Sequence, residues 1–331
     1  MPTWLAAALP VVVAGVASTV TLALLLRHRR SLPFDAPNAR SLHVRPVPRV
    51  GGMAVLAGGA AAGLVGGTAL PGGVAVWSAL GLIAAVSLAD DARGVHPALR
   101  LPIHLVAALV AVTGLLHASG STPGWYIAAG LVLGIAWSAN AFNFMDGSDG
   151  LAAAMAIAGL VAYAFGTPSS PRAMLYWSLA AAVVPFAVMN FPPARVFLGD
   201  GGAVPLGFVA AACGAGEWLL GAWPAWFGLL VFLPFWADAT LTLFRRLVRR
   251  ERVWEAHRDH CYQRLHRMGA DHRGTLLIYG VLMAACAGSA VATLQLEPAV
   301  GWIVLSGWCV VLGSLYLGVD YHWRRRRPSL L

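Results

Sequence analysis

Eleven long apolar runs follow one another along this chain, and short polar stretches separate them. Many hold close to the ~20 residues that a helix needs to cross a lipid bilayer. The runs cover about residues 3–26, 50–70, 74–89, 101–117, 124–142, 150–166, 173–190, 202–218, 223–243, 274–294 and 299–319. Only 11% of the 331 residues are charged, whereas soluble domains have about 25%. The sequence therefore predicts an all-α polytopic membrane protein, a bundle of about 10–11 transmembrane helices in which residues 1–331 form one domain.

The basic side chains, all of them arginine, mark alternate loops. If the N-terminus lies outside the cytoplasm, 22 of the 23 arginines fall on the inner side and only Arg172 falls outside. Loops on the cytoplasmic side are enriched in Lys and Arg. We therefore expect an N-terminus outside the cytoplasm, a cytoplasmic C-terminus and a cleft that faces the cytoplasm. The arginines flank apolar runs and form no patch interleaved with aromatics, which indicates a bilayer and no nucleic acid as partner.

Five aspartates stand at the ends of these runs, all on the predicted inner side. They are Asp90 and Asp91, Asp146 and Asp149, and Asp200. A carboxylate beside hydrocarbon is costly, so such a residue is a functional candidate. Carboxylate oxygens are the ligands that Mg²⁺ prefers. Their arrival from three segments predicts divalent-cation and phosphate chemistry at a membrane surface.

One motif reads Asn140-Ala-Phe-Asn143-Phe-Met-Asp146-Gly-Ser-Asp149-Gly. Its two asparagines are spaced by three and so share a helical face. Amides beside carboxylates can recognise a nucleobase or a sugar hydroxyl. The alternative is a polar turn between two helices.

A second motif starts at Asn190 and ends in Phe197-Leu-Gly-Asp200-Gly-Gly, where a helix is expected to begin. Helix N-termini attract phosphate, and Asp200 would bring Mg²⁺ to that phosphate. The alternative is that Asp200 simply caps its helix.

Two basic loops complete the candidate set. His43 and Arg49 lie in a proline-rich loop after the first run, and His260 and Arg264 lie in a His/Arg-rich cytoplasmic loop at 244–273. His and Arg suit a diphosphate, as cationic clamps or proton donors. Arginines that only fix the topology are the alternative in both loops.

Together these residues resemble the polyprenyl-phosphate N-acetylhexosamine-1-phosphate transferase family, glycosyltransferase family 4, which is related to the phospho-MurNAc-pentapeptide translocase. The resemblance implies that Asp90, Asp91 and His260 are catalytic and that Asp200 and Asp91 bind the metal. It implies that Phe197 stacks on uracil. The further substrate-binding residues that it implies are Asn140, Asn143, Asp146, Asp149, Asn190, Arg264, Arg49 and His43.

The implied reaction is transfer of a sugar 1-phosphate from a UDP-N-acetylhexosamine to undecaprenyl phosphate, with release of UMP. Mg²⁺ is the expected cofactor and Mn²⁺ the alternative, while a second copy of the chain is a candidate partner. Where the family has His-x-His-His, this chain keeps His260 but has Tyr262 and Gln263. That form resembles the subgroup that initiates O-antigen synthesis, which implies N-acetylfucosamine, N-acetylquinovosamine or N-acetylglucosamine as the sugar.

Two other functions fit part of the pattern. A transporter could use the acids as an ion path, but it would place them at mid-membrane depth on broken helices, and here they gather at one face. A prenyltransferase would need Asp-Asp-x-x-Asp, and Gly94 stands at the last position of that motif. No complete motif of a CDP-alcohol phosphotransferase is present either. The transferase interpretation is therefore favoured.

Overall fold

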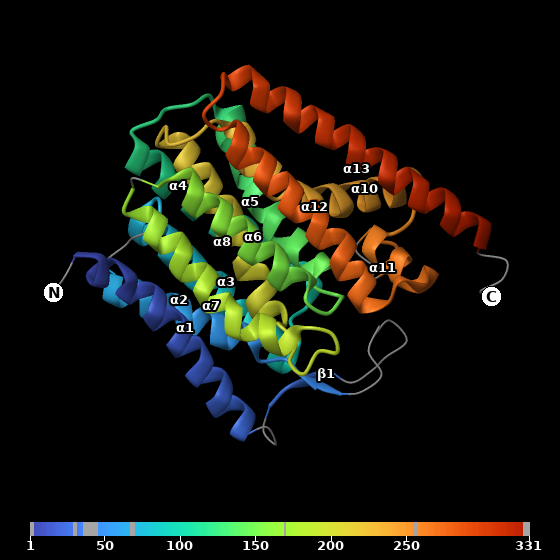
Figure 1. The fold of residues 1–331 in the computed structure, drawn as a ribbon, viewed down its shortest axis with the longest axis horizontal. Coiled ribbons are helices and arrows are strands. Elements are labelled where there is room, and N and C mark those ends of the chain that lie inside the picture. Colours follow the sequence, from blue (N-terminus) through green and yellow to red (C-terminus); the bar gives the residue numbers. More distant parts are fainter. Residues whose placement is uncertain are drawn as a thin grey trace.

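The computed structural model describes residues 3–28, 32–35, 46–66, 70–168, 170–253 and 257–326, and within them the chain is almost entirely helical (Figure 1). Two short strands, β1 (Phe34–Asp35) and β2 (Val47–Pro48), pair antiparallel. The helices are α1 (Thr3–Arg27), α2 (Gly51–Gly66), α3 (Gly73–Arg93), α4 (Pro97–Ser119), α5 (Trp125–Met145), α6 (Leu151–Gly166), α7 (Arg172–Asn190), α8 (Asp200–Leu219), α9 (Ala225–Val231), α10 (Leu233–Val248), α11 (Cys261–Leu265), a π-helical turn (His266–Ala270), α12 (Asp271–Thr293) and α13 (Pro298–Arg326).

These helices confirm the predicted all-α membrane bundle. Among the described residues, eight helical segments are long and apolar enough to cross a bilayer, with α11 to α12 counted as one, and α9 with α10 forms a further, bent candidate span. The shorter apolar helices α2 and α6 have 16 residues each. Within the described residues, every predicted apolar run thus corresponds to a helix or to this bent pair. Large apolar side chains on the outer surface, such as Leu64, Val74 and Leu277, suit a lipid-facing wall.

The ninth predicted run, 223–243, is broken and does not form one straight helix. α9 ends at Val231, α10 begins at Leu233, and the two are bent by 77°. Pro234 stands in the first turn of α10, where proline lacks an N–H and its ring crowds the carbonyl four residues earlier. The predicted loop 244–273 is also largely helical, because α10 continues to Val248 and α11 and the π-helical turn lead into α12.

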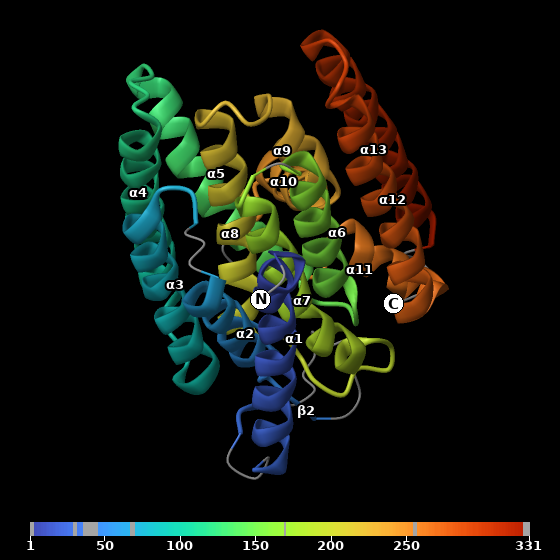
Figure 2. The same ribbon diagram turned by 60° about the vertical axis from the view of Figure 1, so that its left-hand side comes forward.

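Helix α8 is a central helix of the bundle and begins at the end that holds the acidic motifs. It packs against α3, α4 and α5, and its first residues contact α2 (Figure 2). Small residues allow this close packing, as is common between membrane helices. Gly52 of α2 and Gly202 of α8 approach so closely that a Cβ on either would overlap the backbone of the other. The Ser138 hydroxyl of α5 donates to the carbonyl of Gly207 at 2.7 Å. The start of α8 is therefore held from two sides.

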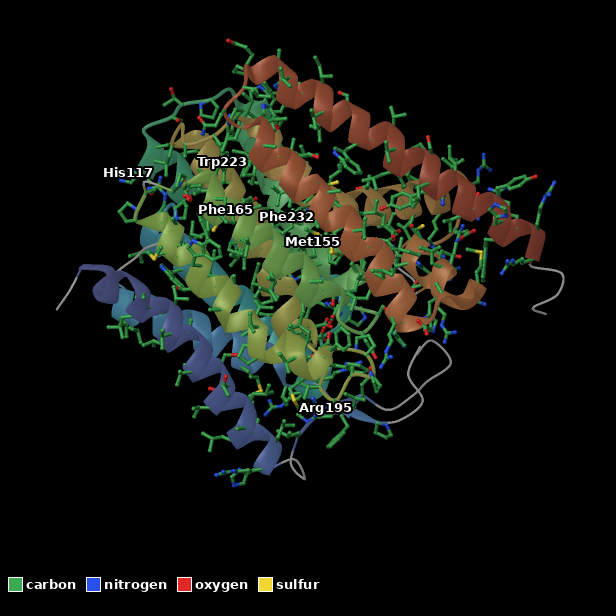
Figure 3. All side chains as sticks on the ribbon, in the orientation of Figure 1. His117, Met155, Phe165, Arg195, Trp223 and Phe232 are labelled. Atoms are coloured by element: carbon green, nitrogen blue, oxygen red, sulfur yellow. The ribbon has the colours of Figure 1, made fainter. Side chains whose placement is uncertain are left out.

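The two ends of the bundle differ in chemistry. In Figure 3, His117 and Arg195 lie at opposite ends, and Arg195 belongs to the end that carries the acidic motifs. At the other end of α8, the buried Glu217 accepts hydrogen bonds from Arg172 at 2.5 and 2.8 Å and from the Tyr176 hydroxyl at 2.6 Å. Breaking a buried ion pair of this kind is strongly destabilising. The pair therefore fixes α7 against α8, far from the acidic motifs.

Candidate active site

Arg100 joins two of the predicted catalytic carboxylates. One guanidinium nitrogen, Nη1, lies 2.8 Å from Oδ2 of Asp90, and the other, Nη2, lies 2.5 Å from Oδ2 of Asp200. Asp90 closes α3, Arg100 lies in the first turn of α4, and Asp200 opens α8. The fold therefore brings the ends of three helices together at the guanidinium of Arg100.

Asp91 contacts the start of α8 directly. Its Oδ1 accepts a hydrogen bond from the backbone N–H of Asp200 at 3.0 Å, and its Oδ2 accepts one from Gly201 at 2.8 Å. A carboxylate at this position caps the helix and favours its dipole. The first two N–H groups of α8 are thus taken by Asp91, so the predicted phosphate position at this helix N-terminus is filled by a side chain in this structure.

Asn143 extends the same group from α5. In the amide orientation that satisfies both neighbours, its nitrogen donates to Oδ1 of Asp200 at 3.2 Å and its oxygen accepts from Nη2 of Arg100 at 2.9 Å. Asn140, one turn earlier, donates to the Ala136 carbonyl at 2.7 Å and lies 3.1 Å from Nδ1 of the buried His104. The two asparagines share a helical face as predicted, but only Asn143 reaches the carboxylates.

Asp146 is the carboxylate with the least compensation. It follows α5, and its carboxylate makes no hydrogen bond to any residue that the structure describes. Its removal from water, together with the negative charges of Asp200 and Asp91, raises its pKa well above the usual range, although Arg49 opposes the shift. A carboxylate held in this way gains most from an added cation.

Asp149 and Asn190 instead hold the loop between α7 and α8. Asp149 accepts from the Ala194 N–H at 2.9 Å. The Asn190 amide accepts from the Gly150 N–H at 2.8 Å and donates to the Val196 carbonyl at 2.9 Å. Both side chains are buried and occupied by backbone partners. In this geometry they shape the wall of the site.

Phe197 and Arg49 lie side by side across a parallel β-bridge. The Phe197 N–H donates to the Pro48 carbonyl at 2.9 Å, and Gly51 donates to the Phe197 carbonyl at 2.9 Å. Arg49 pairs with Asp35 at 2.8 Å, and its pKa is raised because Asp35, Asp91 and Asp200 together outweigh its burial. Arg49 therefore faces the field of the carboxylate group. His43 lies outside the described residues.

His260 lies beside the site on a well-anchored turn. Its ring stacks on Phe144, with centroids 5.9 Å apart, and its Nδ1 is 3.5 Å from Oδ1 of Asp238. Asp238 also accepts from the N–H groups of Cys261 and Tyr262 at 2.8 and 3.2 Å. The broken helix thus carries a buried acid that holds the His260 turn, and its oxygens are taken by protein donors rather than open to an ion path.

Arg264 points away from the carboxylates. Its guanidinium is buried and pairs with Asp320 of α13 and, at 3.3 Å, with Asp259. Substrate contact by Arg264 would need a different rotamer from the one in this structure.

Two residues of the site were missed by the sequence-based prediction. Arg100 was assigned only to membrane topology, although it lies in the same predicted cytoplasmic stretch, 90–100, as Asp90. His272 was not assigned, and its Nδ1 lies 3.1 Å from the Ser148 hydroxyl, 3.2 Å from the Asp149 N–H and 3.6 Å from Oδ1 of Asp149. No sequence spacing links residues more than 120 positions apart.

The side-chain oxygens of this site suit Mg²⁺ only if a substrate supplies further ligands. Within the described part of the chain, no three His, Cys, Asp or Glu side chains are arranged to hold a metal ion by themselves. Mg²⁺ is commonly held by one or two carboxylates plus substrate phosphates. Asp200 and Asp146 offer such oxygens, and burial together with the charges of Asp200 and Asp91 raises the pKa of Asp146. The residues therefore fit a divalent cation that arrives with a phosphate ligand.

Known proteins are similar to the part of the chain that carries these motifs. The profile of glycosyl transferase family 4 matches residues 74–215, which include all five aspartates, Arg100, Asn143 and Phe197. A phospho-N-acetylmuramoyl-pentapeptide-transferase of Desulforudis audaxviator is 33% identical over 60% of this chain and 74% of its own length. The chain belongs to glycosyl transferase family 4.

Other relatives of this family 4 member match over more of the chain. A probable undecaprenyl-phosphate N-acetylglucosaminyl 1-phosphate transferase of Bacillus subtilis is 28% identical over 74% of this chain and 72% of its own length. A decaprenyl-phosphate N-acetylglucosaminephosphotransferase of Mycobacterium tuberculosis is 28% identical over 86% of this chain and 83% of its own length. His260 and Arg264 lie beyond the part that the family 4 profile matches.

Proposed function

We propose that this chain transfers N-acetylhexosamine 1-phosphate from a UDP-sugar to undecaprenyl phosphate. The observation that carries the proposal is the group of Asp90, Asp91 and Asp200 around Arg100 at one end of a membrane bundle. The names of the relatives support a polyprenyl phosphate acceptor and an N-acetylglucosamine 1-phosphate group. An oxygen of the acceptor phosphate attacks the β-phosphorus of the donor. The bond from this phosphorus to the bridging oxygen breaks, and UMP leaves with the electron pair.

The residues divide between the two substrates. Asp90 or Asp91 orients the acceptor phosphate, which is largely ionised at neutral pH, so a general base has little proton to remove. Asp200, with Asp91 or Asp146, would hold Mg²⁺ or Mn²⁺, which would neutralise charge on the diphosphate. Arg100 releases one of its carboxylates to meet the same phosphates.

The nucleotide is placed between the loop after α5 and the loop before α8. Asn143 offers an amide there, and the half-buried Phe197 offers a ring for stacking on uracil. Asp149 and Asn190 keep both loops in register through the hydrogen bonds already described. His260, held by Asp238, approaches from the third side as a cationic clamp or proton donor.

The prenyl chain needs an apolar path to the carboxylates. A cavity of about 330 Å³ lies between α5, α8 and the bent pair α9–α10, with Leu131, Trp218 and Leu229 in its walls. Trp137 also lines it, three residues before Asn140 on α5. We place the first isoprene units there.

The sugar and the biological setting rest on the family resemblance. The Tyr262 and Gln263 substitutions favour UDP-N-acetylfucosamine, UDP-N-acetylquinovosamine or UDP-N-acetylglucosamine as donor and an O-antigen-like glycan as product. The arginine distribution supports a site on the cytoplasmic side, and the family resemblance supports a bacterial inner membrane with the N-terminus in the periplasm. A homodimer is compatible with this arrangement and is tested by the mass of the purified complex.

The test is a release assay. Membranes containing the full chain are incubated with Mg²⁺, undecaprenyl phosphate and each of the three UDP-sugars, and UMP is measured. We expect UMP that depends on both the lipid and the cation with at least one sugar. Absence of such release with every UDP-N-acetylhexosamine, from protein shown to be folded, overturns the proposal.

A further inference from the structure

A second polar pocket lies on the far side of α11 from the carboxylates. It has a volume of about 300 Å³ and lies between the end of α10, α11 and the end of α13. Its lining residues are Arg249, Glu251, Arg264, Asp320, Trp323 and Arg324. None of these residues belongs to the carboxylate group around Arg100.

Helix α11 separates the two sites. The Tyr262 hydroxyl donates to the Phe144 carbonyl at 3.0 Å, which places that side chain against the loop of Asp146. Two residues later, the Arg264 side chain pairs with Asp320 on α13. Consecutive parts of one short helix therefore face the carboxylate site and the second pocket.

The pocket carries an excess of positive charge. Asp320 lies within 4 Å of four arginines: it contacts Arg264, and it lies 2.8 Å from Arg324, 3.8 Å from Arg249 and 3.9 Å from Arg245. Arg246 beside them pairs with Glu251 at 3.1 Å and with Asp259 at 2.8 Å. Five arginines thus face three carboxylates among the described residues. Two positive charges in this network have no carboxylate of their own.

Two residues that line the pocket carry buried donors without an acceptor. Nε1 of Trp323 and Nε of Arg264 make no hydrogen bond with any residue that the structure describes. Each side chain is only 3% exposed. Buried N–H groups are nearly always paired. Two unpaired donors on residues that line one cationic pocket, together with its excess of arginines, favour an anionic acceptor with several oxygens.

The surroundings identify the source of that anion. On the same ends of α10 and α13, the apolar side chains of Leu247, Val248 and Leu317 are 63%, 67% and 64% exposed. These are lipid-facing positions in a membrane bundle, so the pocket lies where lipid headgroups begin. Basic pockets between membrane helices bind anionic headgroups. We propose that this pocket binds the phosphate of an anionic phospholipid, whose acyl chains lie along Leu247 and Leu317.

The consequence is mechanical support for the His260 turn. A headgroup phosphate that bridges Arg249 after α10, Arg264 of α11 and Arg324 of α13 adds a second anion to three elements that Asp320 alone now joins. Asp238 on α10 anchors the N–H groups at the start of α11. A bound lipid therefore steadies α11 where it contacts the loop of Asp146.

The experiment measures lipid binding to the full chain in neutral detergent, by native mass spectrometry with phosphatidylglycerol. The double variant Arg249→Gln/Arg324→Gln is compared with Arg250→Gln/Arg325→Gln. Each arginine of the control pair stands one position after its counterpart in the first pair. Both double variants remove the same charge, but only the first pair lines the pocket. We expect about tenfold weaker binding for the first double variant, the loss typical of removing charge-assisted hydrogen bonds, and less than about twofold for the second.

Trp323→Phe probes the indole N–H. It keeps an aromatic ring for Arg267, whose guanidinium lies 4.6 Å from the Trp323 ring, and it removes the N–H together with part of the bicyclic ring. We expect about fivefold weaker binding of phosphatidylglycerol, the value of one hydrogen bond. Thermal unfolding of each variant in lipid-free detergent confirms that it is folded, so that a loss of binding is attributed to the pocket.

Three further measurements distinguish a phospholipid headgroup from other sources of phosphate. Phosphatidylcholine should bind weakly to the wild type, and excess inorganic phosphate should not displace phosphatidylglycerol. Undecaprenyl phosphate should bind equally to the wild type and to Arg249→Gln/Arg324→Gln, because its site is elsewhere. Equal losses in both double variants, displacement by inorganic phosphate, or a selective loss of undecaprenyl phosphate binding in the pocket variant would each overturn the assignment.

Discussion

Asp91 caps a helix to which it does not belong, because its two carboxylate oxygens accept the backbone N–H groups of Asp200 at 3.0 Å and Gly201 at 2.8 Å. One side chain at the end of α3 therefore sets the position of the carboxylate that opens α8. This contact gives the two aspartates of the pair different roles. Asp90 faces Arg100, and Asp91 faces the backbone.

Asp91→Asn is expected to lose both stability and activity. The amide keeps one acceptor oxygen but turns an NH₂ toward a second N–H, which leaves a donor unsatisfied and costs about 1–3 kcal/mol. Thermal unfolding in detergent and the UMP-release assay measure the two effects. Asp91→Ala serves as a reference for complete loss of the cap. Wild-type unfolding of Asp91→Asn would contradict the capping role.

Asp146→Asn is expected to separate activity from stability. Burial and the charges of Asp200 and Asp91 raise the pKa of Asp146, so its ionised form is unfavourable in the free protein. Asparagine removes that repulsion, and the unfolding temperature should stay the same or rise. Turnover should fall on the order of 100-fold, because a cation ligand is lost. A variant that loses stability along with turnover would show that Asp146 has a structural partner after all.

Arg100→Lys tests whether the Arg100 guanidinium must bridge Asp90 and Asp200. The guanidinium spans Asp90 and Asp200 with two separate nitrogens at 2.8 and 2.5 Å, whereas a lysine ammonium is a single point charge. We expect turnover to fall about tenfold or more, with a smaller change in the KM for the UDP-sugar. Arg93→Lys, at the exposed end of α3, is the matched control. Wild-type kinetics in Arg100→Lys would exclude a bridging role.

The apolar runs predicted the membrane helices well, because burial of about 20 apolar residues in hydrocarbon leaves few alternatives to a helix. The break between α9 and α10 was not predicted. Pro234 is present there, but Pro102, Pro185 and Pro205 lie inside helices that continue past them. Whether a proline breaks or only bends a helix depends on what neighbouring helices offer to the freed carbonyls, and the sequence does not contain that information.

The site was predicted in its residue types and less well in its contacts. Carboxylates at the ends of apolar runs had to gather at one face, and Asp90, Asp91 and Asp200 do so. Asn190 and Asp149 instead make hydrogen bonds to backbone groups, and Arg264 turns toward Asp320. These contacts depend on how helices and loops pack against one another, which the residue pattern does not specify.

His257 should make the protein sensitive to mild acid. Its burial, together with His260 and Arg246, lowers its pKa from 6.5 to about 4. Below pH 6.5 the unfolded chain takes up this proton while the folded chain does not, so stability should fall as the pH drops from about 6.5 to about 4. The pKa of Asp259 is also lowered, through Arg264 and Arg246 against its burial, but it acts below this window.

The measurement is the unfolding temperature against pH for the wild type and His257→Gln. Glutamine cannot be protonated, so the decline between pH 6.5 and 4 should become shallower in the variant. His322→Gln, on the exposed side of α13, is the control and should keep the wild-type slope. Identical slopes in all three proteins would mean that His257 is as accessible to protons when folded as when unfolded.

Gly147 and Tyr262 are coupled through one oxygen atom. A Cβ on residue 147 would overlap the Tyr262 hydroxyl, while the next atom of that ring, Cζ, would lie 3.2 Å away. Gly147→Ala should therefore displace either the Asp146 loop or α11, and we expect turnover to fall about tenfold, as is usual when a catalytic group is shifted. Tyr262→Phe removes the overlapping atom at the cost of its hydrogen bond to Phe144. The double variant Gly147→Ala/Tyr262→Phe should then be more active than Gly147→Ala alone, a positive coupling that a double-mutant cycle on UMP release measures. If the two losses simply add, Tyr262 and the Asp146 loop act independently, and the contact seen here does not position the site.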